Sequence, residues 1–226
     1  GKHPKIINIP FEGAQLKVGL QICEDLWDQE YDCKVSRIQK EMGADFIVNI
    51  SASPYQQDRL LKRKDIILNK VQETSLPFFY CNAIGGQDEL IFDGQSLAFS
   101  EEGIVIGYGT AFKEEIIMVD LKSKNKIDIK IQPREEKMYN ALCLGLKDYF
   151  LKTGHKEAVL GLSGGIDSAL VASIASDALG PENVHCISLP SKYSSDHSLS
   201  DAKELAMNLD LDYRIIPIQK AVDELE

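Results

Sequence analysis

The sequence of 226 residues predicts an α/β protein in two parts, and three observations support this. Over residues 158–217, short apolar strands alternate with helical patterns, as in a parallel sheet with right-handed crossovers. The stretch before residue 122 is richer in strand patterns. A polar, alternating stretch with a terminating Pro133 separates the two and predicts a linker that can include an edge strand. The predicted division is a domain at 1–121, a linker at 122–134 and a domain at 135–226.

The first part mixes strand and helix patterns, and its strongest pattern is an amphipathic helix over Arg59–Glu73. The apolar side of that helix carries Leu60, Leu61, Ile67, Leu68 and Val71. A second helix is expected at Val35–Met42. The expected strands are Leu16–Ile22, Phe46–Ile50, Pro77–Ile84, Ile104–Ile106 and Glu115–Leu121. Leu90–Phe92 and Ser96–Phe99 flank Asp93–Gly94, which predicts a hairpin across that dipeptide.

The second part alternates regularly. We expect, in order, the helix Glu135–Lys152, the strand Ala158–Leu162, the helix Asp167–Leu179, the strand Val184–Leu189, the helix Leu199–Leu209 and the strand Tyr213–Pro217. The chain ends in an acidic, helical stretch, Ala221–Glu226, and it starts without Met. Both ends look cut, so we expect an internal slice of a longer polypeptide.

Charge and composition limit the classes of partner. The formal net charge is −10 and the sequence pI is about 5.0, which argues against nucleic acid and against an anionic membrane. A nucleotide substrate stays open, because a few backbone N–H groups and one cation can bind a phosphate locally. The five cysteines are odd in number and include no CxxC pair, which favours a reducing, cytoplasmic compartment. No signal peptide, membrane-spanning run or histidine metal motif is recognisable.

The most informative segment is the turn between the strand at 158–162 and the following helix, with the sequence Ser163–Gly164–Gly165–Ile166–Asp167–Ser168. Two glycines let the backbone turn sharply and approach a ligand. The first N–H groups of a helix have no intrahelical partner and lie at the positive end of its dipole. Ser163 and Ser168 add hydroxyl donors, so the segment predicts an anion site suited to a pyrophosphate.

This turn is not a Walker A loop, because Ile166 stands where that pattern needs glycine and there is no lysine. A glycine-rich turn without a ligand is the alternative, but the full hexapeptide between strand and helix favours a nucleotide. It resembles the SGGxDS loop of N-type ATP pyrophosphatases. The resemblance implies that ATP and Mg²⁺ bind here, with Asp167 as a metal ligand. The implied ATP-binding residues are Gly161, Leu162, Ser163, Gly164, Gly165, Ile166, Asp167 and Ser168.

Two further segments narrow this family. Leu189–Ser198 resembles the loop after the second strand of bacterial glutamine-dependent NAD synthetases, which implies that Leu189 lies near the adenine. Residues Ser194–Asp196 also read as an N-cap for the next helix, and both interpretations can hold. The helix before the phosphate loop looks like that family as well. Tyr149 on it is a candidate contact for deamido-NAD, although a tyrosine on an amphipathic helix is more often a core residue.

A cysteine follows the first expected strand, in Ile22–Trp27, and this stretch resembles the nucleophile elbow of nitrilase-type glutaminases. Gly85–Gly94 looks like that family's downstream strand-turn-strand. The resemblance implies that the Cys23 thiolate attacks an amide carbonyl. It also implies that Ser53 and Arg59 bind glutamine. A lone cysteine is most often a small buried hydrophobe, which is our interpretation of Cys33, Cys81, Cys143 and Cys186.

The family's catalytic unit is Glu, Lys and Cys, and its Glu and Lys lie upstream of this chain. Glu24 and Lys17 are not their equivalents in motif context. Together, the resemblances imply the C-terminal half of a nitrilase-like αββα sandwich, followed by the start of a Rossmann-like parallel α/β ATP-pyrophosphatase domain.

The activity that the resemblances imply is ATP-dependent amidation of deamido-NAD to NAD with ammonia from glutamine, in a homo-oligomer. One alternative is a GMP synthetase-like amidotransferase, against which the cysteine elbow argues. The other is a non-catalytic nucleotide-binding module.

Overall fold

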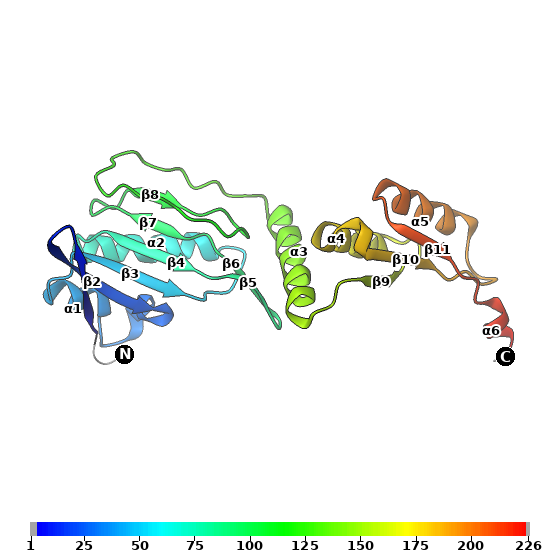
Figure 1. Ribbon diagram of the computed structural model, residues 1–226, viewed down its shortest axis with the longest axis horizontal. Coiled ribbons are helices and arrows are strands. Elements are labelled where there is room, and N and C mark those ends of the chain that lie inside the picture. The colour runs from blue at the N-terminus through cyan, green and yellow to red at the C-terminus, as the bar shows by residue number, and fades with distance from the viewer. Residues whose placement is uncertain (1–3, 225–226) are drawn as a thin grey trace. The chain divides into compact units, whose positions relative to one another are not determined.

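The computed structural model describes residues 4–224 and divides into two compact units (Figure 1). One unit comprises Gly1–Gly85 and Glu89–Lys137, and the other comprises Gly86–Asp88 and Met138–Glu226. Residues 122–134 therefore lie within the first unit. Both units are of the α/β class, which confirms the predicted fold class.

The first unit is built on a six-stranded sheet with the strand order β1-β2-β3-β4-β7-β8. The strands are β1 (Ile6–Phe11), β2 (Ala14–Ile22), β3 (Phe46–Ser51), β4 (Phe78–Asn82), β7 (Leu97–Phe99) and β8 (Val105–Tyr108). β2, β3 and β4 are parallel neighbours, whereas β1, β7 and β8 pair antiparallel. Parallel neighbours bring their carboxyl ends to one edge of the sheet, and Cys23 follows β2 at that edge.

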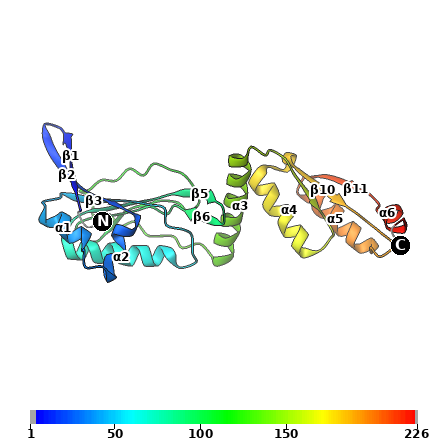
Figure 2. The ribbon, with the colours of Figure 1, turned by 90° about the horizontal axis from the view of Figure 1, so that it is seen from below.

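Two helices cover one face of this sheet, α1 (Val35–Glu41) and α2 (Arg59–Thr74) (Figure 2). The amphipathic pattern of α2 is confirmed for Ile67, which is fully buried in one cluster with Ile47 and Phe78 of the strands, but not for Leu61, which is 41% exposed. Burial of such side chains is the main favourable contribution to the fold, about 1.5–3 kcal/mol for each large one. On the alternate positions of β2 and β3, which face away from these helices, Ile22 and Ile50 are exposed.

The hairpin predicted across Asp93–Gly94 is wrong. β5 (Ile84–Gln87) and β6 (Leu90–Asp93) pair with each other in a separate two-stranded sheet, whereas β7 pairs with β4 and β8. The tight turn therefore falls at Asp88, which has φ +51°. Asp93 is buried in an ion pair with Arg63. β6 ends at this residue, and the chain then crosses to the larger sheet.

The strand predicted at Glu115–Leu121 and the edge strand considered for the linker are also wrong. Residues 113–133 contain no helix or strand. Ile117 and Val119 are half-buried beside Gly107 of β8, but Ile116 and Met118 are 92% and 89% exposed, and no described strand pairs with this stretch. β1, which was not predicted as a separate strand, pairs with β2 across the turn at Glu12 and Gly13.

The second unit contains the predicted parallel sheet, with the strand order β11-β10-β9. Its strands are β9 (Ala158–Gly161), β10 (Val184–Ser188) and β11 (Asp212–Ile215). Its helices are α3 (Arg134–Thr153), which belongs to this unit from Met138 onward, α4 (Ile166–Leu179), α5 (Asp196–Asn208) and α6 (Gln219–Asp223). The short 3-10 helix η3 (Pro181–Asn183) precedes β10. Residues 225–226, at the end of the predicted acidic helix, lie outside the described residues.

Candidate active sites

The cysteine turn has an unusual backbone. Cys23 is partly exposed and is the first residue of the 3-10 helix η1 (Cys23–Leu26), directly after β2. Its φ is +42°, a conformation that few residues other than glycine adopt and that costs of order 1–3 kcal/mol. The Ile22 N–H donates to the Asp25 carboxylate at 2.9 Å, and the Asn49 side-chain amide lies 3.4 Å from the Cys23 carbonyl oxygen. The surrounding structure therefore holds the thiol on a sharp turn.

Register places this turn beside the ends of two other strands. Ile22 is opposite Ile50 of β3, and Ser51 is opposite Asn82 of β4. The residues that follow β2, β3 and β4 therefore share one edge of the sheet. Such an edge is where open parallel sheets usually bind ligands.

Arg59, at the start of α2, lies against the segment that follows the cysteine. Its guanidinium carbon is 5.4 Å from the centre of the Trp27 ring, within cation–π range. Its Nε is buried and has no hydrogen-bond partner in the structure. A buried N–H group without a partner is costly, so this group is suited to an external acceptor such as a carboxylate. Its contact with glutamine stays a prediction.

Ser53 is only 5% exposed, and its hydroxyl accepts hydrogen bonds from Arg63 Nη2 at 3.2 Å and Nε at 3.3 Å. The hydroxyl is thus turned toward the interior, and its predicted contact with glutamine stays untested. Sequence reasoning missed Arg63. The signal was available, because Arg63 stands three residues after Leu60 and four before Ile67, on the buried side of the helix.

The phosphate-loop turn of the second unit, Ser163–Ser168, requires glycine at position 164. Gly164 has φ +81°, and a Cβ added there would lie 2.2 Å from the carbonyl oxygen of Ser198 in α5. The hydroxyl oxygens of Ser163 and Ser168 lie 3.0 Å apart, and the Gly165 N–H donates to Ser163 Oγ at 3.2 Å. These contacts close the turn so that α4 begins at Ile166, after Gly165 as its N-cap.

A pocket of roughly 380 Å³ lies at the carboxyl ends of β9 and β10. It brings the first residues of the phosphate loop together with Leu189, as the sequence predicted for an open sheet edge. Its lining consists of Gly161, Leu162, Ser163, Ile187, Ser188, Leu189, Pro190, Tyr193, Ser194, Ser195, Ser198 and Leu199. The loop residues from Gly164 to Ser168 do not line it. The Ser195 hydroxyl also accepts from the Ser198 N–H, which confirms the predicted N-cap of α5.

Comparison with known proteins decides the family. Residues 4–130 match the carbon-nitrogen hydrolase family, and residues 138–226 match the NAD synthase family. The Glutamine-dependent NAD(+) synthetase of Synechocystis sp. is 42% identical over 216 residues, which cover 90% of this chain and 39% of that protein. The chain belongs to the glutamine-dependent NAD synthetase family. This membership decides against the GMP synthetase-like alternative.

Two more glutamine-dependent NAD synthetases support this family. The protein of Thermotoga maritima is 39% identical over 243 residues, covering 91% of this chain and 42% of that protein. A structure from Acinetobacter baumannii, solved in complex with ADP, has a TM-score of 0.81 and 29% identity, covering 100% of this chain and 43% of that one. The chain thus spans about two fifths of the length of the family members that it matches.

Asp167 fits the metal role that this family implies. Its carboxylate is exposed in the first turn of α4. Within residues 4–224, no group of three or more His, Cys, Asp or Glu side chains could hold a metal ion. Mg²⁺ is commonly held by one or two carboxylates, with water and substrate phosphates as the other ligands. A single carboxylate here therefore suits an ion that arrives with ATP.

The remaining candidate residues differ in exposure. Tyr149 is 59% exposed and stacks on His155, so it is not a core residue, and its contact with deamido-NAD stays a prediction. Cys186 is fully buried, as expected of a small hydrophobe, and burial raises the pKa of its thiol. That expectation is wrong for Cys81, which is exposed. Among the described residues, no helix is long and apolar enough to cross a membrane.

Proposed function

We propose that this chain carries parts of two coupled sites, which together convert deamido-NAD to NAD with glutamine as the nitrogen source. The observation that carries the proposal is the strained backbone at Cys23 in a chain that also holds the glycine turn and its pocket. The proposed domains are a glutaminase portion at 1–121, a linker at 122–134 and a synthetase portion at 135–226.

In the first reaction, the Cys23 thiolate attacks the side-chain amide carbon of glutamine, and ammonia leaves. Water then hydrolyses the thioester to glutamate and regenerates the thiol. The exposed end of β2 presents the sulfur, while Arg59 is placed to bind a charged group of the amino acid. Ser53, which follows the neighbouring strand β3, is the second proposed glutamine-binding residue. The general-base Glu and the Lys of this reaction belong to the family's upstream sequence.

In the second reaction, the carboxylate of deamido-NAD attacks the α-phosphorus of ATP, and pyrophosphate leaves. Ammonia then displaces AMP from the adenylate to form the amide of NAD. Residues 161–168 and Leu189 form the proposed ATP site, since backbone N–H groups at the start of α4 favour an anion. Mg²⁺ on Asp167 would supply positive charge beside the departing pyrophosphate. Tyr149 is the proposed contact for deamido-NAD.

The decisive experiment is Cys23→Ala in the full-length enzyme, by which we mean a polypeptide that contains this chain and spans the length of its relatives. The thiol is required only to release ammonia from glutamine. We therefore expect glutamine-driven NAD formation to vanish while ammonium-driven formation stays within about threefold of wild type, a barrier change below 1 kcal/mol.

The measurement is two steady-state assays on the same purified variant, one with glutamine and one with ammonium chloride. If Cys23 were only a packing residue, both activities would persist or both would fall together through lower stability. Retained glutamine use would remove Cys23 as the nucleophile. Ammonium-driven synthesis itself separates an enzyme from a non-catalytic nucleotide-binding module.

A homo-oligomer is the proposed state of the enzyme, because the family resemblance implies one. The cytoplasm is the proposed compartment, because the odd set of cysteines favours a reducing environment. Within residues 4–224, none of the five cysteines forms a disulfide. Sedimentation of the full-length enzyme would measure the oligomeric state directly.

A further inference from the structure

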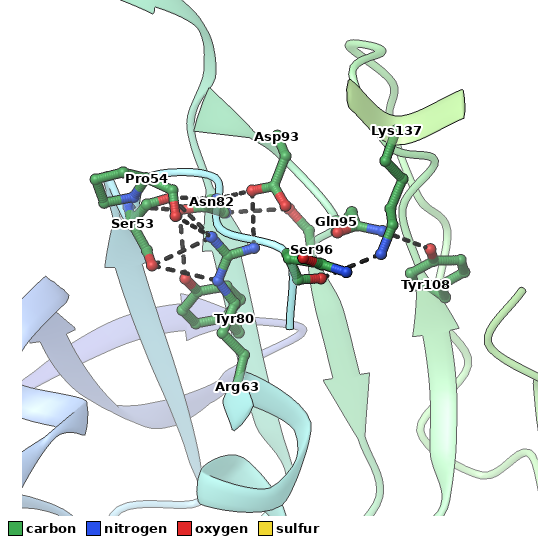
Figure 3. A network of polar contacts seen from close by, with 11 residues as sticks. Ser53, Pro54, Arg63, Tyr80, Asn82, Asp93, Gln95, Ser96, Tyr108 and Lys137 are labelled. Atoms are coloured by element: carbon green, nitrogen blue, oxygen red, sulfur yellow. Dashed lines mark hydrogen bonds and ion pairs between the residues drawn. The ribbon is translucent and has the colours of Figure 1, made fainter. Parts of the chain in front are cut away.

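Arg63 is fully buried near the edge of the six-stranded sheet at which Cys23 follows β2. The side chain of Arg63 is 0% exposed, and it points from α2 toward the end of β3 (Figure 3). Placing a guanidinium in the interior is expensive unless its donors all find partners. Those partners show what the arginine does.

One partner is the carboxylate of Asp93. Arg63 Nη1 lies 2.8 Å from Asp93 Oδ1, and the Asp93 side chain is 2% exposed. Burial raises the pKa of the Asp93 carboxyl, and the positive charge of Arg63 works against that rise. The Asn82 amide, at the end of β4, lies 3.4 Å from the same carboxylate oxygen. The carboxylate thus fixes the orientation of the guanidinium.

The guanidinium carbon lies 5.9 Å from the centre of the Tyr80 ring, and the other hydrogen-bond partners of the guanidinium all lie in one turn, Ser53–Pro54. Arg63 Nη2 donates to the Ser53 carbonyl at 2.7 Å and to the Pro54 carbonyl at 3.3 Å, in addition to the two bonds to the Ser53 hydroxyl. Asn82 donates to the same Ser53 carbonyl at 3.2 Å and accepts from the Ser53 N–H at 2.8 Å. The N–H, carbonyl and hydroxyl of Ser53 are therefore all held.

This turn lies next to the cysteine. Ser53 follows β3, whose neighbour β2 ends at Ile22, directly before Cys23. Arg63 also stands one helical turn after Arg59, which contacts Trp27 on the segment after the cysteine. The first two turns of α2 thus connect both segments that border the proposed glutamine site.

We infer that Arg63 and Asp93 are positioning residues for glutamine binding, which hold the Ser53–Pro54 turn beside Cys23 without touching the substrate. The inference rests on the glutaminase function proposed above. An ion pair that served packing alone could be replaced by apolar residues of similar size with little loss. The four bonds from Arg63 to the turn are what such a replacement would not restore.

The test is the paired replacement Arg63→Met with Asp93→Leu in the full-length enzyme. It leaves no buried charge unpaired, so the fold should survive better than in Arg63→Met alone. We expect the KM for glutamine to rise by roughly tenfold or more, as for the loss of binding energy from a misplaced group. Ammonium-driven synthesis should stay within about twofold.

Ile67→Ala is the matched control, because Ile67 is fully buried on the same helix, one turn after Arg63. It should lower the melting temperature through a cavity and leave the KM for glutamine unchanged. If the paired replacement fails to fold, Arg63→Lys replaces it, because lysine keeps the charge but lacks the fork of donors. A raised KM in folded Arg63→Lys supports the inference.

An unchanged KM in a folded variant, or a KM that rises equally in Ile67→Ala, would overturn the positioning role. If that happened while Cys23→Ala still abolished glutamine use, only this inference would fall. Glutamine use by Cys23→Ala would instead remove the proposed function, and the positioning role with it.

Discussion

Gly164 shows how much of the synthetase site depends on one missing side chain. A Cβ at this position would lie 2.2 Å from a backbone oxygen of α5, and backbone cannot move aside cheaply. We expect Gly164→Ala in the full-length enzyme to raise the KM for ATP by roughly tenfold or more, because the clash and the left-handed φ together cost at least ~1–3 kcal/mol. Ammonium-driven NAD synthesis at varied ATP measures this.

Gly154→Ala is the control for Gly164→Ala. Gly154 also has a left-handed φ, +76°, but an added Cβ would meet nothing within 4 Å. It should lose about 1 kcal/mol of stability and keep its KM for ATP. Equal effects of the two variants on the KM would show that strain alone, and not the contact with α5, matters at the loop.

Asp167→Ala should abolish synthesis from glutamine and from ammonia alike. Its exposed carboxylate at the start of α4 is the proposed metal ligand, and its loss removes charge neutralisation where pyrophosphate departs. The measurement is turnover at saturating ATP and Mg²⁺, with Asp177→Ala near the other end of the same helix as a control. Near-normal ammonia-driven turnover of Asp167→Ala would contradict the metal role.

Sequence reasoning found the residues whose chemistry is local and missed those whose partners are distant. The sharp turns at Cys23 and at 163–168 were predicted, the first from the family resemblance of its flanking sequence and the second from its glycine pair, and the roles of their residues stay predictions. Arg63 was missed because a charged residue is usually exposed, and only its partner Asp93, thirty residues away, makes burial affordable. Lys70 on the same helix is buried for the same reason, paired with Asp28.

At the scale of elements, α5 depends on the residue that caps its N-terminus, Ser195. The Ser195 hydroxyl accepts from the Ser198 N–H at 3.1 Å and so satisfies one of the unpaired donors of the helix. Ser195→Ala should lower the stability of α5 by about 1 kcal/mol. Hydrogen exchange of the first amides of α5 in the full-length enzyme measures this loss of stability. Ser200→Ala, which removes only a bond to the His197 carbonyl within the helix, should change exchange little.

Element prediction succeeded where the pattern determines the partner. In the second unit, alternation of strand and helix leaves few topologies, and the parallel sheet was predicted correctly. In Glu115–Leu121, alternation indicated an extended chain but could not supply a neighbouring strand, and Ile116 remained exposed. Asp93–Gly94 was read as a hairpin because a buried aspartate looks like a turn aspartate in sequence.

At the scale of the whole molecule, the described helices of the first unit, α1 and α2, cover only one face of the six-stranded sheet. Leu20, Ile22 and Ile50 are 36%, 67% and 53% exposed on the other face, at neighbouring positions on two paired strands. Contiguous apolar surface of this kind usually marks a contact with other protein. The αββα sandwich of the family provides such a contact, because two sheets pack face to face in it.

The 226 residues expressed alone should therefore fold poorly and show no glutaminase activity. The exposed apolar face should bind a hydrophobic dye and promote association, and the general-base Glu and the Lys of the family would be absent.

Ile50→Thr makes the prediction sharper, because its effect should reverse with context. In the 226-residue piece it should reduce dye binding and increase the soluble fraction. In the full-length enzyme, where a second sheet would cover position 50, it should destabilise by about 1–3 kcal/mol, because a hydroxyl is then buried in place of an apolar group. Dye fluorescence and urea melts of the four proteins test both halves. A sharp cooperative melt of the piece with measurable glutamine hydrolysis, or stabilisation by Ile50→Thr in both contexts, would show that this face stays open to solvent.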